Sequence, residues 1–232
     1  MTDSAKKFDT ARAQEYDQQS RIALAGYDAC HELVACVLAA ALQPDPPARL
    51  LIAGAGTAQE VITIGALEPS WRFTAVDPSA AMIELAGARL KAAGFGDRVA
   101  LHRGYVDDLD LEPFDGATLI GVLHHLQGEE AKQAILRSIA SRLKPDAPFI
   151  LACNHYEYAR QPVLLSAWRQ RWRMHGATAE EIEAKLGRIM QGAEPPKSEQ
   201  AVTTLLSDAG FGEATRFFSS LFWSAWVTRR AA

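Results

Sequence analysis

The sequence predicts a single α/β domain built on a mostly parallel sheet, and three observations predict it. The first is size, because 232 residues and 25.3 kDa suffice for one sizeable core. The second is the strict alternation of short aliphatic runs with amphipathic helical stretches after residue 48, which is typical of a helix-covered parallel sheet. The third is the end of the chain, where two short strand patterns joined by a tight turn predict an antiparallel hairpin.

The composition is that of an ordinary globular protein with a mildly acidic charge balance. Hydrophobic residues make up 48% and charged residues 22% of the chain, which excludes a disordered chain and a coiled coil. The net charge is −4 and the sequence pI is about 5.9, so the sequence does not predict the basic field that binds nucleic-acid backbones. We therefore expect a small-molecule substrate and no nucleic acid as partner, and a homodimer stays open.

The cysteines and the apolar runs predict a cytoplasmic protein. Cys30, Cys36 and Cys153 are odd in number and have no metal-ligand spacing, so we expect buried, reduced thiols and no metal site. Residues 1–8 are polar and charged, unlike a secretory signal. The longest apolar run, residues 33–42, is about half as long as a membrane span, so we expect a buried helix there and no membrane partner.

The predicted domain, residues 1–232, divides into four consecutive parts. Residues 1–45 form an N-terminal helical cover, because apolar residues recur at helical spacing over 8–42 before Pro44, Pro46 and Pro47 stop the pattern. Residues 48–154 form the core of the sheet. Residues 160–192 are a helical insertion, and residues 198–230 are the last helix and the terminal hairpin.

Within these parts the pattern predicts each element in order. Aliphatic runs predict strands over residues 49–53, 71–76, 99–102, 114–121, 147–153, 214–218 and 222–228. Helical periods predict helices over about 57–67, 79–93, 129–143, 162–191 and 198–208. Ser79 is placed to cap the second of these helices, and Gly94 and Gly96 are placed to end it.

The end of the first predicted strand carries the first sign of a ligand site. Gly54-Ala55-Gly56 lies between that strand and a helix, where glycine allows a close approach of the backbone to a ligand and the helix start offers free amide donors. Asp77 ends the second strand, where a carboxylate can accept hydrogen bonds from both hydroxyls of a ribose. This order predicts an adenosine cofactor, either a dinucleotide or a smaller one.

Motifs further along the chain distinguish between the cofactor classes. Phe114-Asp115 opens the fourth strand, Val122-Leu-His-His-Leu126 follows it, Leu143-Lys-Pro145 precedes the fifth strand, and Ala209-Gly-Phe211 precedes the hairpin. In this order the motifs resemble the class I S-adenosylmethionine-dependent methyltransferases, from about residue 48 to the end apart from the insertion. A nicotinamide dehydrogenase would share the glycine loop and Asp77, but the Leu-Lys-Pro turn and the hairpin would stay unexplained.

The resemblance implies a Rossmann-like fold, a cofactor and a set of site residues. The sheet would have seven strands in the order 3-2-1-4-5-7-6, six parallel and the last antiparallel, with helices on both faces. The cofactor would be S-adenosylmethionine, bound under an N-terminal helical lid. Gly54, Ala55 and Gly56 would pass under its methionine part, and Asp77 would hold its ribose. The other implied cofactor-binding residues are Tyr27, Pro78, Met82, Tyr105, Val106, Ile120 and Gly121.

Two positions depart from the family pattern. The family usually has an acid after the glycine that follows strand three, to accept from the adenine amine, whereas Tyr105 and Val106 follow Gly104 here. That hydrogen bond is then absent or supplied by Asp107. The family also usually has an acid two residues before the first glycine, which orders the loop and the amino group of the cofactor, whereas this chain has Ile52. A non-catalytic S-adenosylmethionine-binding protein is therefore one alternative.

The N-terminal cover and the insertion resemble most the branch that contains carboxy-S-adenosylmethionine synthase. In that branch a tyrosine after a glycine touches the cofactor, and Gly26-Tyr27-Asp28 matches it. The synthase binds an extra carboxylate through an arginine of its insertion, where this chain has Leu186, with Arg188 two residues on. A synthase-like enzyme is therefore a second alternative.

Candidate acceptor-site residues follow the fourth and fifth strands, at the edge where substrates approach an open α/β sheet. His124 and His125 could each act as a general base or be a hydrogen-bonded turn residue. Asn154 could hydrogen-bond an acceptor or belong to a polar surface loop. Methyl transfer from a sulfonium needs chiefly alignment, so the residues predict the cofactor better than the acceptor. We expect an S-adenosylmethionine-dependent methyltransferase acting on a small molecule.

Overall fold

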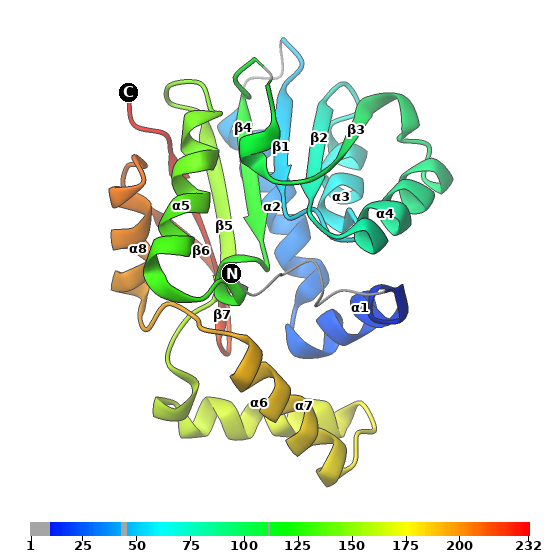
Figure 1. The fold of residues 1–232 in the computed structure, drawn as a ribbon, viewed down its shortest axis with the longest axis vertical. Coiled ribbons are helices and arrows are strands. Elements are labelled where there is room, and N and C mark those ends of the chain that lie inside the picture. Colours follow the sequence, from blue (N-terminus) through cyan, green and yellow to red (C-terminus); the bar gives the residue numbers. More distant parts are fainter. Residues whose placement is uncertain (1–9, 43–45, 111) are drawn as a thin grey trace.

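The fold is built on one seven-stranded sheet, in a computed structural model that describes residues 10–42, 46–110 and 112–232 (Figure 1). The strands are β1 (Arg49–Ala53), β2 (Arg72–Asp77), β3 (Val99–Arg103), β4 (Gly116–Ile120), β5 (Pro148–Asn154), β6 (Thr215–Ser220) and β7 (Trp223–Arg229). They lie in the order β3-β2-β1-β4-β5-β7-β6, and β7 is antiparallel to both of its neighbours. The predicted order and the antiparallel terminal hairpin are confirmed.

Helices cover both faces of the sheet, because successive residues of a strand point to opposite sides. One face carries Leu50 and Ile52 of β1 and packs against α2 (Tyr27–Ala41), α3 (Gln59–Leu67) and α4 (Ala80–Ala92). The other face carries Leu51 and Ala53 and packs against α5 (Gly128–Ser141) and α8 (Glu199–Asp208). The strand is therefore apolar on both sides, as its uninterrupted aliphatic run predicts.

Three further helices gather at one end of the sheet, at the bottom of Figure 1: α1 (Thr10–Ala23), α6 (Pro162–Met174) and α7 (Ala179–Gly192). They share an apolar cluster in which Trp168 and Trp172 of α6 and Leu186 of α7 join Ile22 of α1 and Phe222. The N-terminal cover and the insertion therefore form one structure. They cover the end at which ligands bind in open α/β sheets.

Two predicted segments differ from the structure. The helical pattern over 8–42 is two helices, because Gly26 adopts φ +87° between α1 and α2, a conformation that ends a helix. Residues 8–9 and Pro44 lie outside the described residues. The insertion is also two helices, separated by Gly176 at φ +87°. The other element ends differ by a residue or two, and the Ser79 cap is confirmed, since its hydroxyl accepts from the Met82 N–H at 3.3 Å.

The expectation of three buried cysteines is wrong at one position. Cys30 and Cys153 are buried free thiols, but Cys36 is exposed. Cys36 lies on α2, whose buried residues Val34, Ala35 and Leu38 face the sheet, so position 36 points outward. The helical period, rather than the residue type, decides which thiol is buried.

Within residues 10–42, 46–110 and 112–232, no single helix has both the length and the apolar character to cross a membrane. The pair Asp17–Ala23 and Tyr27–Ala41 has both only when its two helices, which are bent by 91°, are counted together.

Candidate cofactor and acceptor site

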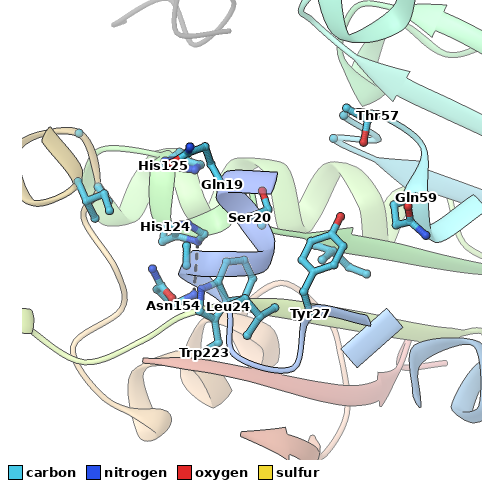
Figure 2. Close-up of a pocket in the computed structure, with 18 of the residues that line it drawn as sticks. Gln19, Ser20, Leu24, Tyr27, Thr57, Gln59, His124, His125, Asn154 and Trp223 are labelled. Carbon is cyan, nitrogen blue, oxygen red and sulfur yellow. Dashed lines mark hydrogen bonds between the residues drawn. The ribbon is translucent and has the colours of Figure 1, made fainter. Parts of the chain in front are cut away.

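A cavity of about 740 Å³ lies at the carboxyl edge of the sheet, under α1, α6 and α7 (Figure 2). The ends of β1, β4 and β5 contribute Gly54, Gly121 and Asn154 to its floor. On the helical side, the described lining residues include Gln19 and Ser20 of α1, Leu24 directly after it, Tyr27 and His31 of α2, Trp168 and Trp172 of α6, and Lys185 and Arg188 of α7. A cavity of this size holds a small ligand.

The glycine loop forms one side of the cavity. Gly54 and Gly56 have φ of +67° and +50°, and the N–H groups of Gly54 and Ala55 both donate to the carbonyl of Val76, at 2.8 and 3.0 Å. A Cβ on Gly54 would overlap Cγ2 of Val122, so only glycine fits there. The loop therefore offers its bare backbone to the cavity, which fits the methionine end of S-adenosylmethionine.

Asp77 ends β2 beside this loop. Its carboxylate accepts hydrogen bonds from the N–H of Gly56 at 3.0 Å and from the N–H of Ser79 at 2.8 Å. Burial raises the pKa of Asp77, and the two backbone hydrogen bonds oppose that shift. Asp77 is buried and does not line the cavity. In this structure it orders the glycine loop, and its oxygens keep lone pairs that a ribose could use.

A second buried carboxylate lies in the cavity, and the sequence analysis did not single it out. Glu60 of α3 is 5% exposed and is the one acidic side chain among the described residues of the lining. The hydroxyl of Thr118 on β4 donates to its Oε1 at 2.8 Å. Burial raises the pKa of Glu60 to about 8, against the Thr118 hydrogen bond and with a contribution from the Asp77 carboxylate.

Polar and aromatic side chains face the glycine loop from the other side of the cavity (Figure 2). The N–H of Asn154 donates to Nδ1 of His124 at 3.4 Å, which assigns the proton of a neutral His124 ring to Nε2. Trp223 packs edge-on against His124, with centroids 5.2 Å apart. Asn154 donates from Nδ2 to the Tyr158 hydroxyl at 2.8 Å, but its buried Oδ1 has no partner among the described residues. Such an oxygen fits a ligand that brings a donor.

Hydrogen bonds hold α1 over the cavity from two sides. Asp17 accepts from the Thr57 hydroxyl at 2.7 Å and from Arg89 of α4. At the end of α1, Nε1 of Trp168 donates to the Ala23 carbonyl at 2.7 Å, and Arg171 donates to the carbonyls of Ile22 and Arg21 at 2.7 and 2.8 Å. These carbonyls belong to the last turn of a helix, where intrahelical donors run out. The predicted lid is therefore tied to the glycine loop and to the insertion.

The structure brings together part of the predicted site. The cavity is lined by Tyr27, Gly54, Ala55, Gly56, Ile120, Gly121, His124 and His125. It is not lined by Asp77, Pro78, Met82, Tyr105 or Val106, the residues that the resemblance placed around the ribose and adenine. Tyr105 is 55% exposed, and Asp107 accepts from the Ser138 hydroxyl of α5 through Oδ1. The ligand roles of all these residues stay predictions.

Glu60, His31 and Trp223 are among the lining residues that the sequence analysis did not identify as ligand contacts. His31 is buried, its Nδ1 lies 2.9 Å from the Tyr27 carbonyl, and burial lowers its pKa, so the ring stays neutral. The one available signal was its spacing, because His31 follows Tyr27 by one helical turn and shares its face. Among the described residues, no group of three or more His, Cys, Asp or Glu side chains could hold a metal ion.

Comparison with known proteins identifies the core of the sheet. Residues 51–149 match the family model described as a methyltransferase domain. They include the glycine loop, Asp77, and both histidines after β4. Residues 51–149 are a methyltransferase domain. The recognition of the class I S-adenosylmethionine-dependent family is confirmed for this segment, whereas the layout of the carboxy-S-adenosylmethionine synthase branch is not.

A relative and two solved structures add to this comparison. An uncharacterized protein of Synechococcus is 34% identical over 99 residues, which are 42% of this chain and 23% of that protein, so the chain spans about a quarter of its length. Magnesium protoporphyrin IX methyltransferase of Synechocystis PCC 6803, solved with bound SAH (S-adenosylhomocysteine), matches this structure with a TM-score of 0.63 at 18% sequence identity. The match covers 89% of this chain and 84% of the methyltransferase chain. An O-methyltransferase family protein of Burkholderia thailandensis has a TM-score of 0.65 at 13% identity, with coverages of 96% and 60%. At these identities the structures establish the fold.

Proposed function

We propose that the protein transfers the methyl group of S-adenosylmethionine to a small-molecule acceptor in the cavity under α1. One observation carries the proposal: a single cavity joins the glycine loop of the methyltransferase domain to a wall of His124, His125, Asn154 and tryptophans. Gly54 to Gly56 and Asp77 would hold the cofactor. When bound, S-adenosylmethionine supplies a methyl group that its sulfonium has already activated.

The wall opposite the glycine loop would bind the acceptor and remove its proton. Oδ1 of Asn154 would accept a hydrogen bond from an O–H or N–H of the acceptor other than the one that loses its proton, and Nε2–H of His124 would donate a hydrogen bond to the acceptor. His125, half-buried on the same turn, would take the proton of the acceptor as its bond to the methyl carbon forms and the carbon–sulfur bond breaks. The protein thus contributes alignment and one proton transfer.

The helical cover and the charge favour a small molecule over a nucleic acid as the acceptor. The cavity is covered by residues of three helices, and the chain has a net charge of −4. A polynucleotide would need an open and basic approach to the same edge. A small acceptor that fits beside the cofactor in about 740 Å³ needs neither an open nor a basic approach.

A binding measurement and then a turnover measurement test this function. Calorimetry should detect one S-adenosylmethionine per chain, and incubation with a panel of phenols, carboxylic acids and amines should release S-adenosylhomocysteine with one of them. With that acceptor, His125→Ala should lower kcat at least tenfold, and Asn154→Ala should mainly raise KM. His175→Ala, an exposed histidine after α6, is the matched control. A chain that binds no S-adenosylmethionine would overturn the proposal.

A ligand with an additional carboxylate is the second candidate, because Arg188 lines the cavity. Leu186, at the position that corresponds to the synthase arginine, is fully buried in the cluster around Trp168. Arg188 has no hydrogen-bond or ion-pair partner within the part of the chain that the structure describes. Mass spectrometry of the small molecules released from freshly purified protein separates the candidates. S-adenosylmethionine or its demethylated product supports a methyltransferase, a carboxylated derivative supports a synthase, and binding without turnover of any acceptor supports a non-catalytic protein.

A further inference from the structure

The proposed function leaves the carboxylate of Glu60 without a role. Oε1 accepts from the Thr118 hydroxyl, while Oε2 has no donor among the described residues, although the side chain is 5% exposed and faces the cavity. The charged form of a carboxyl group with so little exposure is costly unless a cation or further donors compensate it. The groups that act on it are the Asp77 carboxylate and the Thr118 hydroxyl, and neither is a cation. The site is therefore poised to receive a positive group from a ligand.

The sheet register shows where this carboxylate lies relative to the first strand. Thr118 is the register partner of Ile52, and side chains of register partners lie side by side on one face of a sheet. Ile52 is fully buried in the cluster that includes Val61 and Ile64 of α3, the helix that carries Glu60. Through its hydrogen bond with Thr118, the carboxylate of Glu60 lies beside the register partner of Ile52. Position 52 is two residues before Gly54, the first glycine of the loop. An acid at position 52 itself would reach the same place from the strand.

We propose that Glu60 binds the α-ammonium group of the cofactor. The inference rests on the proposed function, because it needs the methionine end of S-adenosylmethionine beside the glycine loop. Glu60 lies four residues after Gly56, in the first turn of α3, and lines the same cavity as Gly54, Ala55 and Gly56. An ammonium group is a compact cation with three donors, so it can supply Oε2 with a hydrogen bond and the carboxylate with a charge partner.

Among the groups around Glu60, Glu60 itself is the one that can pair with such a cation. Cys30 of α2 faces it as a neutral thiol, because burial raises the pKa of Cys30 to about 12 with a contribution from Glu60. Asp77 of β2 already accepts from two backbone N–H groups, and Thr118 of β4 is uncharged. His31 of α2 lines the cavity as a neutral ring. An ammonium would favour the charged form of Glu60, so binding near neutral pH should release the proton that burial retains.

Glu60→Gln tests the proposal with two ligands. Glutamine keeps the shape of the side chain and an oxygen for the Thr118 hydroxyl, but it removes the charge. The Kd for S-adenosylhomocysteine should rise at least tenfold, while the Kd for 5′-methylthioadenosine, which lacks the amino-acid end, should stay within twofold. An equal rise for S-adenosylmethionine would assign the effect to the ammonium, which both ligands share, and not to the sulfonium. Glu130→Gln, an exposed acid on α5, is the matched control.

Proton release on ligand binding gives a second readout. Calorimetry of S-adenosylhomocysteine binding at pH 7, in buffers of different ionisation enthalpy, should show about one proton released per ligand by the wild type and none by Glu60→Gln. Equal weakening of both ligands in Glu60→Gln would overturn the role of Glu60, and so would an unchanged Kd with no proton released by the wild type. Failure of the wild type to bind S-adenosylhomocysteine would overturn the proposed function instead.

Discussion

At the scale of single residues, Asp77 belongs to the fold as well as to the predicted ribose site, because its carboxylate accepts the N–H groups of Gly56 and Ser79. Asp77→Ala should therefore abolish binding of S-adenosylmethionine and also lower the free energy of unfolding by about 2 kcal/mol, since two backbone donors lose their acceptor. Calorimetry and urea unfolding measure the two effects separately. Asp97→Ala, on an exposed residue, is the control, and unchanged cofactor binding in Asp77→Ala would refute the assigned site.

Gly54 gives a second prediction at this scale. Gly54→Ala should lower the free energy of unfolding by about 1–2 kcal/mol through its left-handed backbone, and by more through overlap with Val122. Val122→Ala in the same chain should restore the steric part and leave the backbone part. Urea unfolding of both single variants and the double variant forms a cycle, and additive effects would show that the overlap is absent.

The sequence revealed those site residues whose role follows from chain position. Gly54 and Asp77 lie directly after strands, where parallel topology alone sends them to the ligand edge. Glu60 and His31 could not be found in this way, because a glutamate in the first turn of a helix and a histidine in an apolar helix have ordinary surface and core explanations. Their place in the cavity depends on how α2 packs against α3 and on the register of β1 with β4.

At the scale of elements, α1 is a lid whose attachment can be weakened at one end. Asp17→Asn should weaken the contacts to Thr57 and Arg89, whose partly exposed ion pair is worth about 1 kcal/mol. Amide hydrogen exchange in α1 should then be about fivefold faster, and bound S-adenosylhomocysteine should reduce the difference. Glu183→Gln breaks an exposed pair between α6 and α7 and should leave α1 unchanged. Equal exchange in Asp17→Asn and the wild type would mean that this contact does not hold the lid.

The other end of the lid depends on the insertion. Arg171→Ala removes the donors to the Ile22 and Arg21 carbonyls, so the free energy of unfolding should fall by about 1–2 kcal/mol, and the Kd for S-adenosylhomocysteine should rise. Arg173→Ala changes an exposed arginine of the same helix and should do neither. If both variants unfold at the same urea concentration as the wild type, the insertion does not support α1.

Element by element, the sequence predicted the strands well and the helical cover less well. The strands are short apolar runs bounded by turns, so their ends were found within a residue or two. The break between α1 and α2 was not placed, because the apolar pattern continues through Gly26, and a glycine can also lie inside a helix. The division of the insertion at Gly176 was missed for the same reason.

At the scale of the whole molecule, the sheet order itself places the site. The chain runs outward from β1 to β3 on one side and then returns to β4 and β5 on the other, so the loops after β1 and β4 diverge and leave a crevice between them. The glycine loop and the turn that carries His124 and His125 lie on the two sides of that crevice. Helices α1, α6 and α7 lie at this end of the sheet (Figure 1), and their residues line the side of the cavity opposite the strand ends.

The stability of the whole molecule should depend on pH through its buried titratable groups. Burial lowers the pKa of His31 and His155, so their contribution is lost as the pH falls below about 6.5. Burial raises the pKa of Glu60 from 4.5 to about 8, so its contribution is complete below pH 4.5 and is lost as the pH rises through 8. Comparing wild type with Glu60→Gln isolates this acid, because the histidines and Asp77 are common to both.

The free energy of unfolding of the wild type, relative to Glu60→Gln, should therefore fall by on the order of a few kcal/mol between pH 5 and pH 8. Urea unfolding at a series of pH values measures the difference. Saturating S-adenosylhomocysteine should reduce this fall in the free energy of unfolding, because an ammonium group beside Glu60 stabilises the carboxylate that forms at high pH. A difference that does not change with pH would show that Glu60 is already charged in the folded protein, and the ligand would then have no buried proton to release.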